Sequence, residues 1–318
     1  MYEEMMGTKP VSEGQKFDVE ALAAWLRANA PGFPDGPLEV EQFKGGQSNP
    51  TFKLRAGGQQ FVLRTKPGPA AKLLPSAHAI DREFRVMQAL HGAGFPVPRQ
   101  IVLCTDESVI GRAFFLMECV EGRVLWEQSL PGMSKEERGA IYDEMNRVIG
   151  QLHTIDYAAI GLADYGKPGN YFARQIERWT KQYQASSTET IEAMDRLIEW
   201  LPQNIPPGED TAIVHGDFRL DNIIFHPTEP RILAVLDWEL SPWATRWRTF
   251  PTTACPGTSS QASSAASPAS TWPNWASRAW RNTCAAIANA PARPSVPRIS
   301  ISISPTTCSA WPASCRGS

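Results

Sequence analysis

The feature that most constrains the fold of this chain is a sharp change in composition after Ser241. All 33 Asp and Glu residues lie in residues 1–241, whereas residues 242–318 contain no Asp, Glu or Lys and seven Arg. The formal net charge of −2 therefore combines −9 over residues 1–241 with +7 over the remainder. Ser, Ala, Thr and Pro make up 48 of the last 77 residues, with no sustained helical or strand periodicity. Two kinds of sequence are therefore joined at this point, and residues 1–241 are interpreted separately from the remainder.

The remaining composition indicates an ordinary globular protein. Hydrophobic residues make up 42% of the chain, which is enough for a packed core. A net charge near zero gives no general case for nucleic acid or an anionic membrane as partner. No stretch approaches the ~18–20 apolar residues of a membrane helix, and the polar residues 1–15 are unlike a signal peptide. We expect a cytoplasmic protein with no membrane or nucleic-acid partner; its oligomeric state is left open.

Residues 1–120 are predicted to form a first lobe, which combines a small antiparallel sheet with one long helix. Asp18 can cap an earlier helix that ends near Pro31. Gly57 and Gly58 form a hairpin turn between two strands. The predicted strands cover residues 38–44, 51–55, 61–64, 101–104 and 113–120, and the long helix carries Ile80, Phe84, Met87 and Leu90 on one face.

Residues 121–241 are predicted to form a partial second lobe that is mostly helical. Ser134 and Glu137 fit a capping box at the start of one helix. Two further helical patterns cover residues 171–183 and 191–201, and Pro202 is expected to end the second of these. Three short apolar runs at residues 212–214, 223–225 and 232–236 then indicate strands.

One segment concentrates the residues that carry chemistry. Residues 213–225 read Ile-Val-His-Gly-Asp-Phe-Arg-Leu-Asp-Asn-Ile-Ile-Phe, and Leu-Asp-Trp-Glu follows at residues 236–239. A loop between two short strands, followed by an Asp at a strand end, can bring Asp217, Asn222 and Asp237 together. Carboxylate and amide oxygens suit Mg²⁺, and an Asp beside such a metal can accept a proton from a hydroxyl.

This segment resembles the catalytic loop of the aminoglycoside phosphotransferase and choline kinase family. That family shares the protein-kinase fold, in which an Asn follows the catalytic Asp by five residues, as Asn222 follows Asp217. One branch, found alone in bacteria and as the N-terminal part of some acyl-CoA dehydrogenases, is similar in further segments: Phe-Val-Leu-Arg, Asp-Arg-Glu-Phe-Arg, Met-Glu-Cys-Val-Glu-Gly and Tyr-Asp-Glu-Met-Asn. The resemblance spans residues 38–241. It implies an α+β, protein-kinase-like two-lobed fold whose C-terminal lobe is incomplete here.

The resemblance also implies an enzyme that uses ATP and Mg²⁺ to transfer the γ-phosphoryl group to a hydroxyl of a small molecule. In this reading Asp217 is the catalytic base, and Arg219 meets the transferring phosphoryl group. Asn222 and Asp237 hold Mg²⁺.

The first lobe supplies the implied nucleotide site. Arg64 would reach the α/β phosphates, and Glu83 would hold Arg64 in place. The phosphate-covering turn would comprise Gly45, Gly46, Ser48 and Asn49, and the hinge that receives adenine would comprise Met117, Glu118 and Val120. Two departures from protein kinases stand out: the turn reads Gly-Gly-Gln-Ser-Asn, and Arg64 stands where they have Lys.

Simpler interpretations of these residues stay open. We expect His215 to order its own loop rather than act as a base. Asp221 is expected to be a solvated neighbour, and Glu239 is left out of the metal set. Arg64 and Glu83 could be an ordinary surface pair, and the glycine turn could be a plain hairpin turn.

Two other functions also stay open. One is a non-catalytic pseudo-kinase or nucleotide-binding truncation. The other is a metal hydrolase that uses His215, Asp217 and Asp237. The acceptor is undetermined among an aminoglycoside, a choline-like compound and a hydroxyl on an acyl-CoA-like metabolite.

We interpret residues 242–318 as a segment translated out of frame, and hence disordered or non-native. When each codon is restarted at the third base of the preceding one, the codons from Ser241 onward permit Thr-Leu-Gly-Asp-Pro-Leu-Ala-Asp-Phe. The related family commonly continues after Asp-Trp-Glu in this way. The replaced segment would leave apolar surface exposed on residues 1–241 and would impair activity.

Resequencing the Ser241 codon tests this hypothesis. A missing base at or near that codon, in the gene or in its sequencing, is the expected result. An unbroken frame that encodes Pro242 and Trp243 would reject it.

Overall fold

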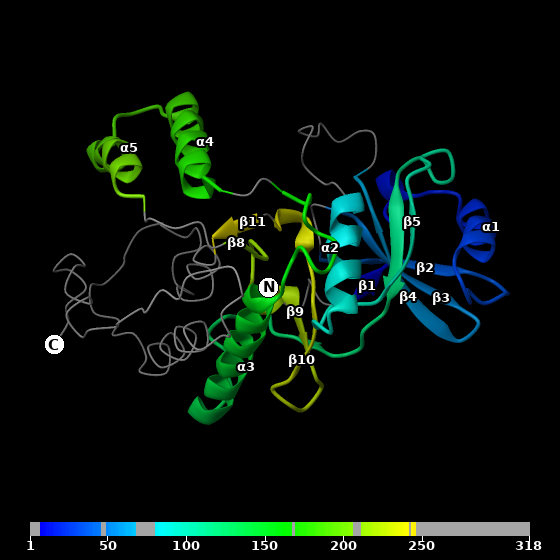
Figure 1. Ribbon diagram of the computed structural model, residues 1–318. Coiled ribbons are helices and arrows are strands. Elements are labelled where there is room, and N and C mark those ends of the chain that lie inside the picture. The colour runs from blue at the N-terminus through cyan, green and yellow to red at the C-terminus, as the bar shows by residue number, and fades with distance from the viewer. Residues whose placement is uncertain are drawn as a thin grey trace.

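The computed structural model describes residues 7–45, 49–67, 80–166, 169–205 and 211–241, together with the backbone of 243–245. The first lobe is built on one sheet, shown on one side of the molecule in Figure 1, in which every neighbouring pair of strands is antiparallel. Its strand order is β1-β2-β3-β4-β6-β5. These strands are β1 (Thr8–Lys9), β2 (Glu39–Phe43), β3 (Thr51–Ala56), β4 (Gln59–Thr65), β5 (Gln100–Cys104) and β6 (Phe114–Glu118).

The predicted hairpin between β3 and β4 is confirmed. Gly57 and Gly58 both have positive φ, at 52° and 77°, which is the conformation that a two-residue hairpin loop of the I′ type requires. Along β3, residues 52, 54 and 56 are buried while their neighbours are more exposed, so the strand follows the period of two that one buried face imposes.

Helix α1 (Val19–Asn29) covers one face of this sheet. Its N-cap is Asp18, whose Oδ1 accepts a hydrogen bond of 2.9 Å from the N–H of Ala21, as the sequence predicts. Leu22 and Leu26 of α1 pack in one core cluster with Phe52 and Leu54 of β3. The sheet and this helix therefore form a hydrophobic core that belongs to the first lobe alone.

Helix α2 (Ile80–Gly92) joins the two lobes. Its residues Val86, Met87 and Leu90 belong to a second and larger core cluster. That cluster also holds Val62 of β4 and extends to Leu152 on the long helix of the second lobe. Because one continuous core contains side chains of both lobes, the position of α2 is set by both.

The second lobe combines three helices with two small sheets. Helix α3 (Lys135–Thr154) begins with the predicted capping box, in which Ser134 Oγ accepts from the N–H of Glu137 and the Glu137 carboxylate accepts from the N–H of Ser134. The sheets have the orders β10-β9-β7 and β11-β8. The other elements are α4 (Tyr171–Ser186), α5 (Glu192–Gln203), β7 (Arg123–Val124), β8 (Thr211–Ile213), β9 (Ile223–Phe225), β10 (Ile232–Val235) and β11 (Trp243–Thr245), with 3₁₀ helices at Glu13–Gln15, Leu220–Asn222 and Trp238–Leu240.

The α+β architecture and the order of its helices are confirmed, with three differences. Helix α5 continues through Pro202 to Gln203, whereas we expected it to end there. Strands β1 and β7 were not predicted, because each has two residues, which is too short to show the alternation of buried and exposed side chains. Residues 243–245 form β11 beside β8, although they lie in the segment expected to be non-native. Residues 246–318 lie outside the described residues, so that expectation and the lobe boundaries stay predictions.

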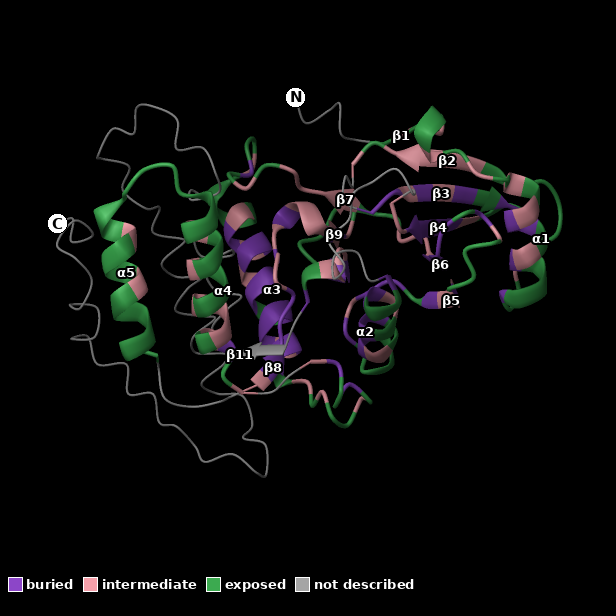
Figure 2. Cartoon of the chain, turned by 90° about the horizontal axis from the view of Figure 1, so that it is seen from above, coloured by how far each residue is buried: buried purple, intermediate pink, exposed green. Residues whose placement is uncertain are grey.

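Helices α4 and α5 expose apolar side chains to solvent. Figure 2 shows α5 mostly green and α4 in bands of green and pink, whereas α3 is largely purple. Trp179 and Trp200 are each 56% exposed. The other large exposed apolar residues of this region are Ile191, Leu197, Leu201 and Ile205. Large exposed apolar side chains of the described residues thus gather on and around α4 and α5.

Among the described residues, no helix has the length and the apolar composition needed to span a membrane.

Replacing both exposed tryptophans, Trp179→Gln and Trp200→Gln, should reduce aggregation and binding of a fluorescent hydrophobic dye. The melting temperature should hardly change, because exposed substitutions usually shift stability by no more than about 0.5 kcal/mol. Leu152→Ala on α3 is the matched control, because Leu152 is fully buried and its truncation should cost about 2–5 kcal/mol. If the double variant lost as much stability as Leu152→Ala, the exposed surface described above would be wrong.

Candidate active site

A buried guanidinium lies where the two lobes meet. Arg64, near the end of β4, donates from Nε to Glu83 Oε2 on α2 at 2.8 Å. Its Nη2 donates to Asp237 Oδ1 at 2.5 Å and lies 3.8 Å from Glu239 Oε2. Glu83 is only 2% exposed, so this is not an ordinary surface pair. Arg64 therefore connects the sheet, α2 and the segment that follows β10.

Burial has a strong effect on the ionisation of this cluster. Desolvation raises the pKa of Glu83 to about 7, because Arg64 only partly offsets burial and because Asp237 and Glu239 add negative charge nearby. Burial alone would lower the Arg64 pKa, but Glu83 and Asp237 outweigh it, and the pKa is raised. The guanidinium stays charged, and it is shared among three carboxylates.

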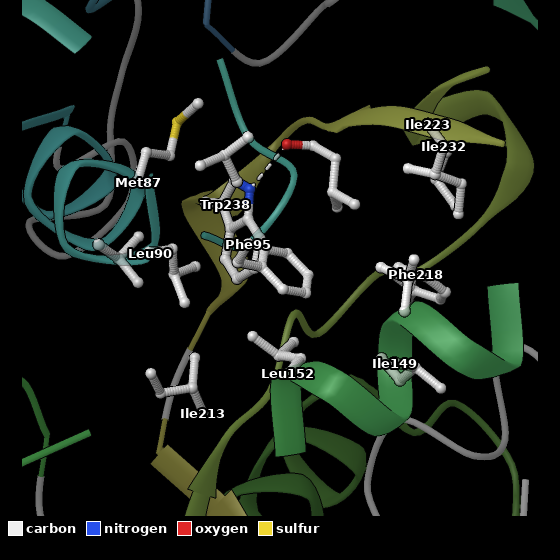
Figure 3. Packing of buried hydrophobic residues seen from close by; sticks show 14 of the residues in the cluster. Met87, Leu90, Phe95, Ile149, Leu152, Ile213, Phe218, Ile223, Ile232 and Trp238 are labelled. Carbon is white, nitrogen blue, oxygen red and sulfur yellow. Dashed lines mark hydrogen bonds between the residues drawn. The ribbon is translucent and has the colours of Figure 1, made fainter. Parts of the chain in front are cut away.

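The turn that ends β10 is held by a buried tryptophan. Asp237 has a left-handed backbone, with φ 65° and ψ 61°, a conformation that a non-glycine residue seldom adopts outside a constrained site. Trp238 donates from Nε1 to the Val235 carbonyl at 2.9 Å and packs edge-to-face on Phe95, as Figure 3 shows. Met87 and Leu90 of α2 lie beside the same indole. This packing keeps Asp237 directed toward Arg64.

His215 fastens the predicted catalytic loop to the same turn. Its Nε2 is 2.7 Å from the Leu236 carbonyl, and its Nδ1 accepts from the N–H of Asp217 at 3.2 Å. The ring is fully buried and packs on Trp238 with centroids 4.7 Å apart. Burial lowers the His215 pKa, so the imidazole is neutral and donates from Nε2. The structure places His215 in the ordering role that we expected.

Two more contacts bring the loop and the turn close together. Asn222 Nδ2 donates to both the carbonyl and Oδ2 of Asp217, each at 3.0 Å. The Asn222 carbonyl accepts from the N–H of Leu236 at 2.8 Å, one residue before Asp237. Gly216 allows this approach, because its φ is +91° and an added Cβ would lie 2.5 Å from the Leu240 carbonyl oxygen. The loop that carries Asp217 and Asn222 is thus held against the turn that carries Asp237.

Arg219 and Asp221 form an ion pair beside Asp217. Arg219 Nη2 is 2.6 Å from Asp221 Oδ2, and Arg219 Nε is 3.2 Å from Asp217 Oδ1. Gln128, which precedes α3, donates from Nε2 to Asp221 Oδ1 at 3.2 Å. The expectation that Asp221 is a solvated neighbour is therefore wrong: its side chain is 18% exposed and holds two partners.

The phosphate-covering turn is described only at its two ends. Gly45 is described, whereas Gly46 and Ser48 lie outside the described residues. Asn49 is 1% exposed and donates from Nδ2 to Glu239 Oε2 at 3.0 Å. The last residue of the turn is thus joined through Glu239 to the segment that carries Asp237.

The predicted hinge spans the end of β6: Met117 and Glu118 are its last two residues, and Val120 follows it. Met117 is buried, and its sulfur lies 3.9 Å from Gln100 Nε2. Glu118 donates its N–H to the Arg99 carbonyl at 3.0 Å and accepts from the N–H of Arg99 at 2.8 Å through its carboxylate. These two hydrogen bonds hold Glu118 against Arg99, the residue before β5. Val120 is therefore the one predicted hinge residue that lies beyond the end of β6.

No pattern in the sequence indicates the role of Gln128 or the partner of Asn49. Gln128 lies outside any periodic element, 93 residues from Asp221, and Asn49 is 190 residues from Glu239. For Glu239, the Asp-Trp-Glu pattern of residues 237–239 is the feature of the sequence that places a second carboxylate close to Asp237.

The chain is similar to known proteins in sequence and in fold. Residues 39–254 match the model of the phosphotransferase enzyme family. The acyl-CoA dehydrogenase family member 10 of Mus musculus is 50% identical over 234 residues, which cover 74% of this chain and 22% of that protein. A chicken relative, acyl-CoA dehydrogenase family member 11, is matched over 30% of its length. The chain thus spans less than a third of these curated relatives.

Solved structures show the same fold. A Ralstonia eutropha protein assigned to the aminoglycoside phosphotransferases is 64% identical, with a TM-score of 0.66 over 73% of this chain and 67% of that one. The aminoglycoside phosphotransferase APH(2")-IIa, solved as a ternary complex with streptomycin and ATP, is 15% identical with a TM-score of 0.56 over 86% and 83% of the two chains. The expected kinase-like fold is confirmed.

The Glu83 pKa predicts a pH-dependent stability. A carboxylate whose pKa rises from 4.5 to about 7 on folding stabilises the protein below pH 4.5 relative to higher pH, and that contribution is lost as pH rises through about 7. In the presence of a chelator, the stability of the wild type relative to Glu83→Gln should fall by on the order of 3 kcal/mol between pH 4.5 and 7. Thermal melts across this range measure it.

The exposed Glu20→Gln on α1 is the control, and it should show no such trend. A difference between wild type and Glu83→Gln that does not change with pH would contradict the assigned environment.

Proposed function

The chain belongs to the phosphotransferase enzyme family, and from this premise we propose that it transfers the γ-phosphoryl group of ATP, with Mg²⁺, to a hydroxyl of a small molecule. The observation that carries the proposal is that Asn222 binds Asp217 while contacts at Leu236 hold this loop against the turn that carries Asp237. The same fold holds ATP and streptomycin in APH(2")-IIa.

Asp217 is proposed as the base that orients the acceptor hydroxyl and accepts its proton. Its Oδ2 is fixed by Asn222, so the carboxylate has a defined direction before substrate arrives. The side chain is 26% exposed, which leaves it accessible to an acceptor. Orientation by a fixed carboxylate is the main protein contribution that phosphoryl transfer needs, because the protein performs little covalent chemistry in this reaction.

Asn222 and Asp237 are proposed to hold Mg²⁺. Asn222 donates from Nδ2 to Asp217, so its amide oxygen can bind a cation. Asp237 accepts from Arg64 through Oδ1, so its Oδ2 can do the same. Such oxygen ligands fit a hard cation. Bound there, Mg²⁺ would supply positive charge that neutralises the charge developing in phosphoryl transfer.

Arg64 and Arg219 are proposed as the positive charges of the site. Arg64 is directed by Glu83 and Asp237, and Arg219 stands beside Asp217. The glycine turn (Gly45, Gly46, Ser48 and Asn49) and the hinge (Met117, Glu118 and Val120) are proposed to receive the nucleotide. A fixed cation at a site of developing negative charge lowers the barrier more than a mobile one.

The acceptor is proposed to be a hydroxyl on an acyl-CoA-like metabolite. The support is the identity of 50% to a protein named for acyl-CoA dehydrogenation. The aminoglycoside and the choline-like compound are the competing acceptors. We further propose that the out-of-frame tail impairs the enzyme, because apolar side chains of α4 and α5 in the second lobe are exposed to solvent.

The metal hydrolase is disfavoured by His215. Both of its ring nitrogens are engaged within the protein, and the ring is fully buried. It is therefore not available as a metal ligand.

The test is transfer of labelled γ-phosphate from ATP to a panel of hydroxylated acceptors, with the 318-residue chain and with a chain whose frame is restored after Ser241. The restored chain should form a phosphorylated product that needs both ATP and Mg²⁺, and the 318-residue chain should be much slower. Asp217→Asn should lower kcat by roughly 10²–10⁴-fold while the nucleotide still binds.

Asp35→Asn is the control, because the Asp35 side chain is 99% exposed and its ion-pair partner is Arg27 of α1, outside the proposed site. Nucleotide binding without transfer in the restored chain would identify a pseudo-kinase. Product formed without ATP would identify a hydrolase. Either outcome would overturn the proposed function.

A further inference from the structure

A chain of hydrogen bonds runs from the core of the second lobe to Arg219. Tyr142 on α3 is buried and donates from its hydroxyl to the Gln128 carbonyl at 2.7 Å. The Gln128 side chain donates to Asp221 Oδ1 at 3.2 Å, and Asp221 Oδ2 is 2.6 Å from Arg219 Nη2. The last member, Arg219, then faces Asp217. We name Tyr142, Gln128, Asp221 and Arg219 the Arg219 relay.

Arg219 and Asp217 form an ion pair without a hydrogen bond between Arg219 Nε and the carboxylate. Arg219 Nε lies 3.2 Å from Asp217 Oδ1, which is within ion-pair distance. The Nε group nevertheless makes no hydrogen bond in the described part of the protein. A guanidinium free to turn would pair with a carboxylate through two parallel hydrogen bonds, which is its preferred arrangement. Something therefore holds Arg219 out of that arrangement.

Asp221 is the group that can do so. It binds the Nη2 end of the same guanidinium, which fixes the plane of the fork. Asp221 itself cannot follow Arg219 toward Asp217, because its other oxygen is held by Gln128. The backbone of Gln128 is anchored in turn by Tyr142, a side chain with little freedom in the core.

We propose that Asp221 and Gln128 are positioning residues that hold Arg219 away from a closed ion pair with Asp217. This rests on the proposed function, in which Asp217 must stay free to accept a proton and Arg219 must face the transferring phosphoryl group. Without Asp221 and Gln128, Arg219 would turn toward Asp217 and form a closed ion pair with the proposed base. Neither Asp221 nor Gln128 touches substrate in this scheme.

Gln128→Ala is the cleanest variant, because the Tyr142 bond goes to the backbone and survives the change. In the frame-restored chain it should lower kcat by roughly tenfold or more with the KM for ATP within about twofold, because a small displacement of a catalytic charge is costly. Asp221→Asn should act in the same direction. Gln182→Ala, an exposed change on α4, should leave kcat unchanged.

The decisive comparison repeats Gln128→Ala in an Arg219→Ala background. If the relay acts through Arg219, Gln128→Ala should cause no further loss of kcat there. An equal loss with and without Arg219 would show a merely structural role and overturn the proposal, as would an unchanged kcat in Gln128→Ala alone.

A stability cycle in the 318-residue chain tests the relay without any activity. The melting temperatures of Gln128→Ala, Asp221→Asn and the double variant should be non-additive by about 2 °C, because contacting groups couple. Additive shifts would overturn the proposal. If the wild type transfers no phosphate at all, the proposed function fails while this cycle still decides whether the relay exists.

Discussion

The structure depends most on one buried cation, the guanidinium of Arg64. It bonds to Glu83 on α2 and to Asp237 after β10, so a single side chain joins the sheet of the first lobe to the turn of the second. Removing one partner of a buried ion pair typically costs about 3–5 kcal/mol, because the remaining charge loses its compensation. Here the remaining charges would be three carboxylates. The lobes are thus joined by electrostatics at the point where a nucleotide phosphate would lie.

The second lobe supplies a rigid frame around that cation. Trp238 packs against α2, His215 binds the Leu236 carbonyl, and Gly216 lets the loop approach Leu240. These contacts use backbone groups and neutral rings, so they place Asp217 and Asn222 without adding charge. The charged side chains can then bind a substrate or a metal, or pair with each other. Arg219 illustrates the last case, because it pairs with Asp221 of the same loop and lies beside Asp217.

The sequence predicted what local patterns encode. The capping box at Ser134, the hairpin at Gly57 and the five-residue spacing from Asp217 to Asn222 all appear as expected, because each depends on residues close in the chain. Contacts such as Gln128 with Asp221 and Asn49 with Glu239 were missed, because pairs 93 and 190 residues apart leave no spacing pattern. The assignment of Asp221 failed for this reason: its solvation depends on a distant glutamine.

Hydrogen exchange on Arg64→Ala tests most directly whether this cation joins the lobes. Amides of α2 and of residues 236–241 should lose protection together relative to wild type, because Glu83 and Asp237 would both lose the group that holds them. The change should appear in the 318-residue chain without any ligand. Loss of protection confined to β4, with both of the other segments unchanged, would contradict the account.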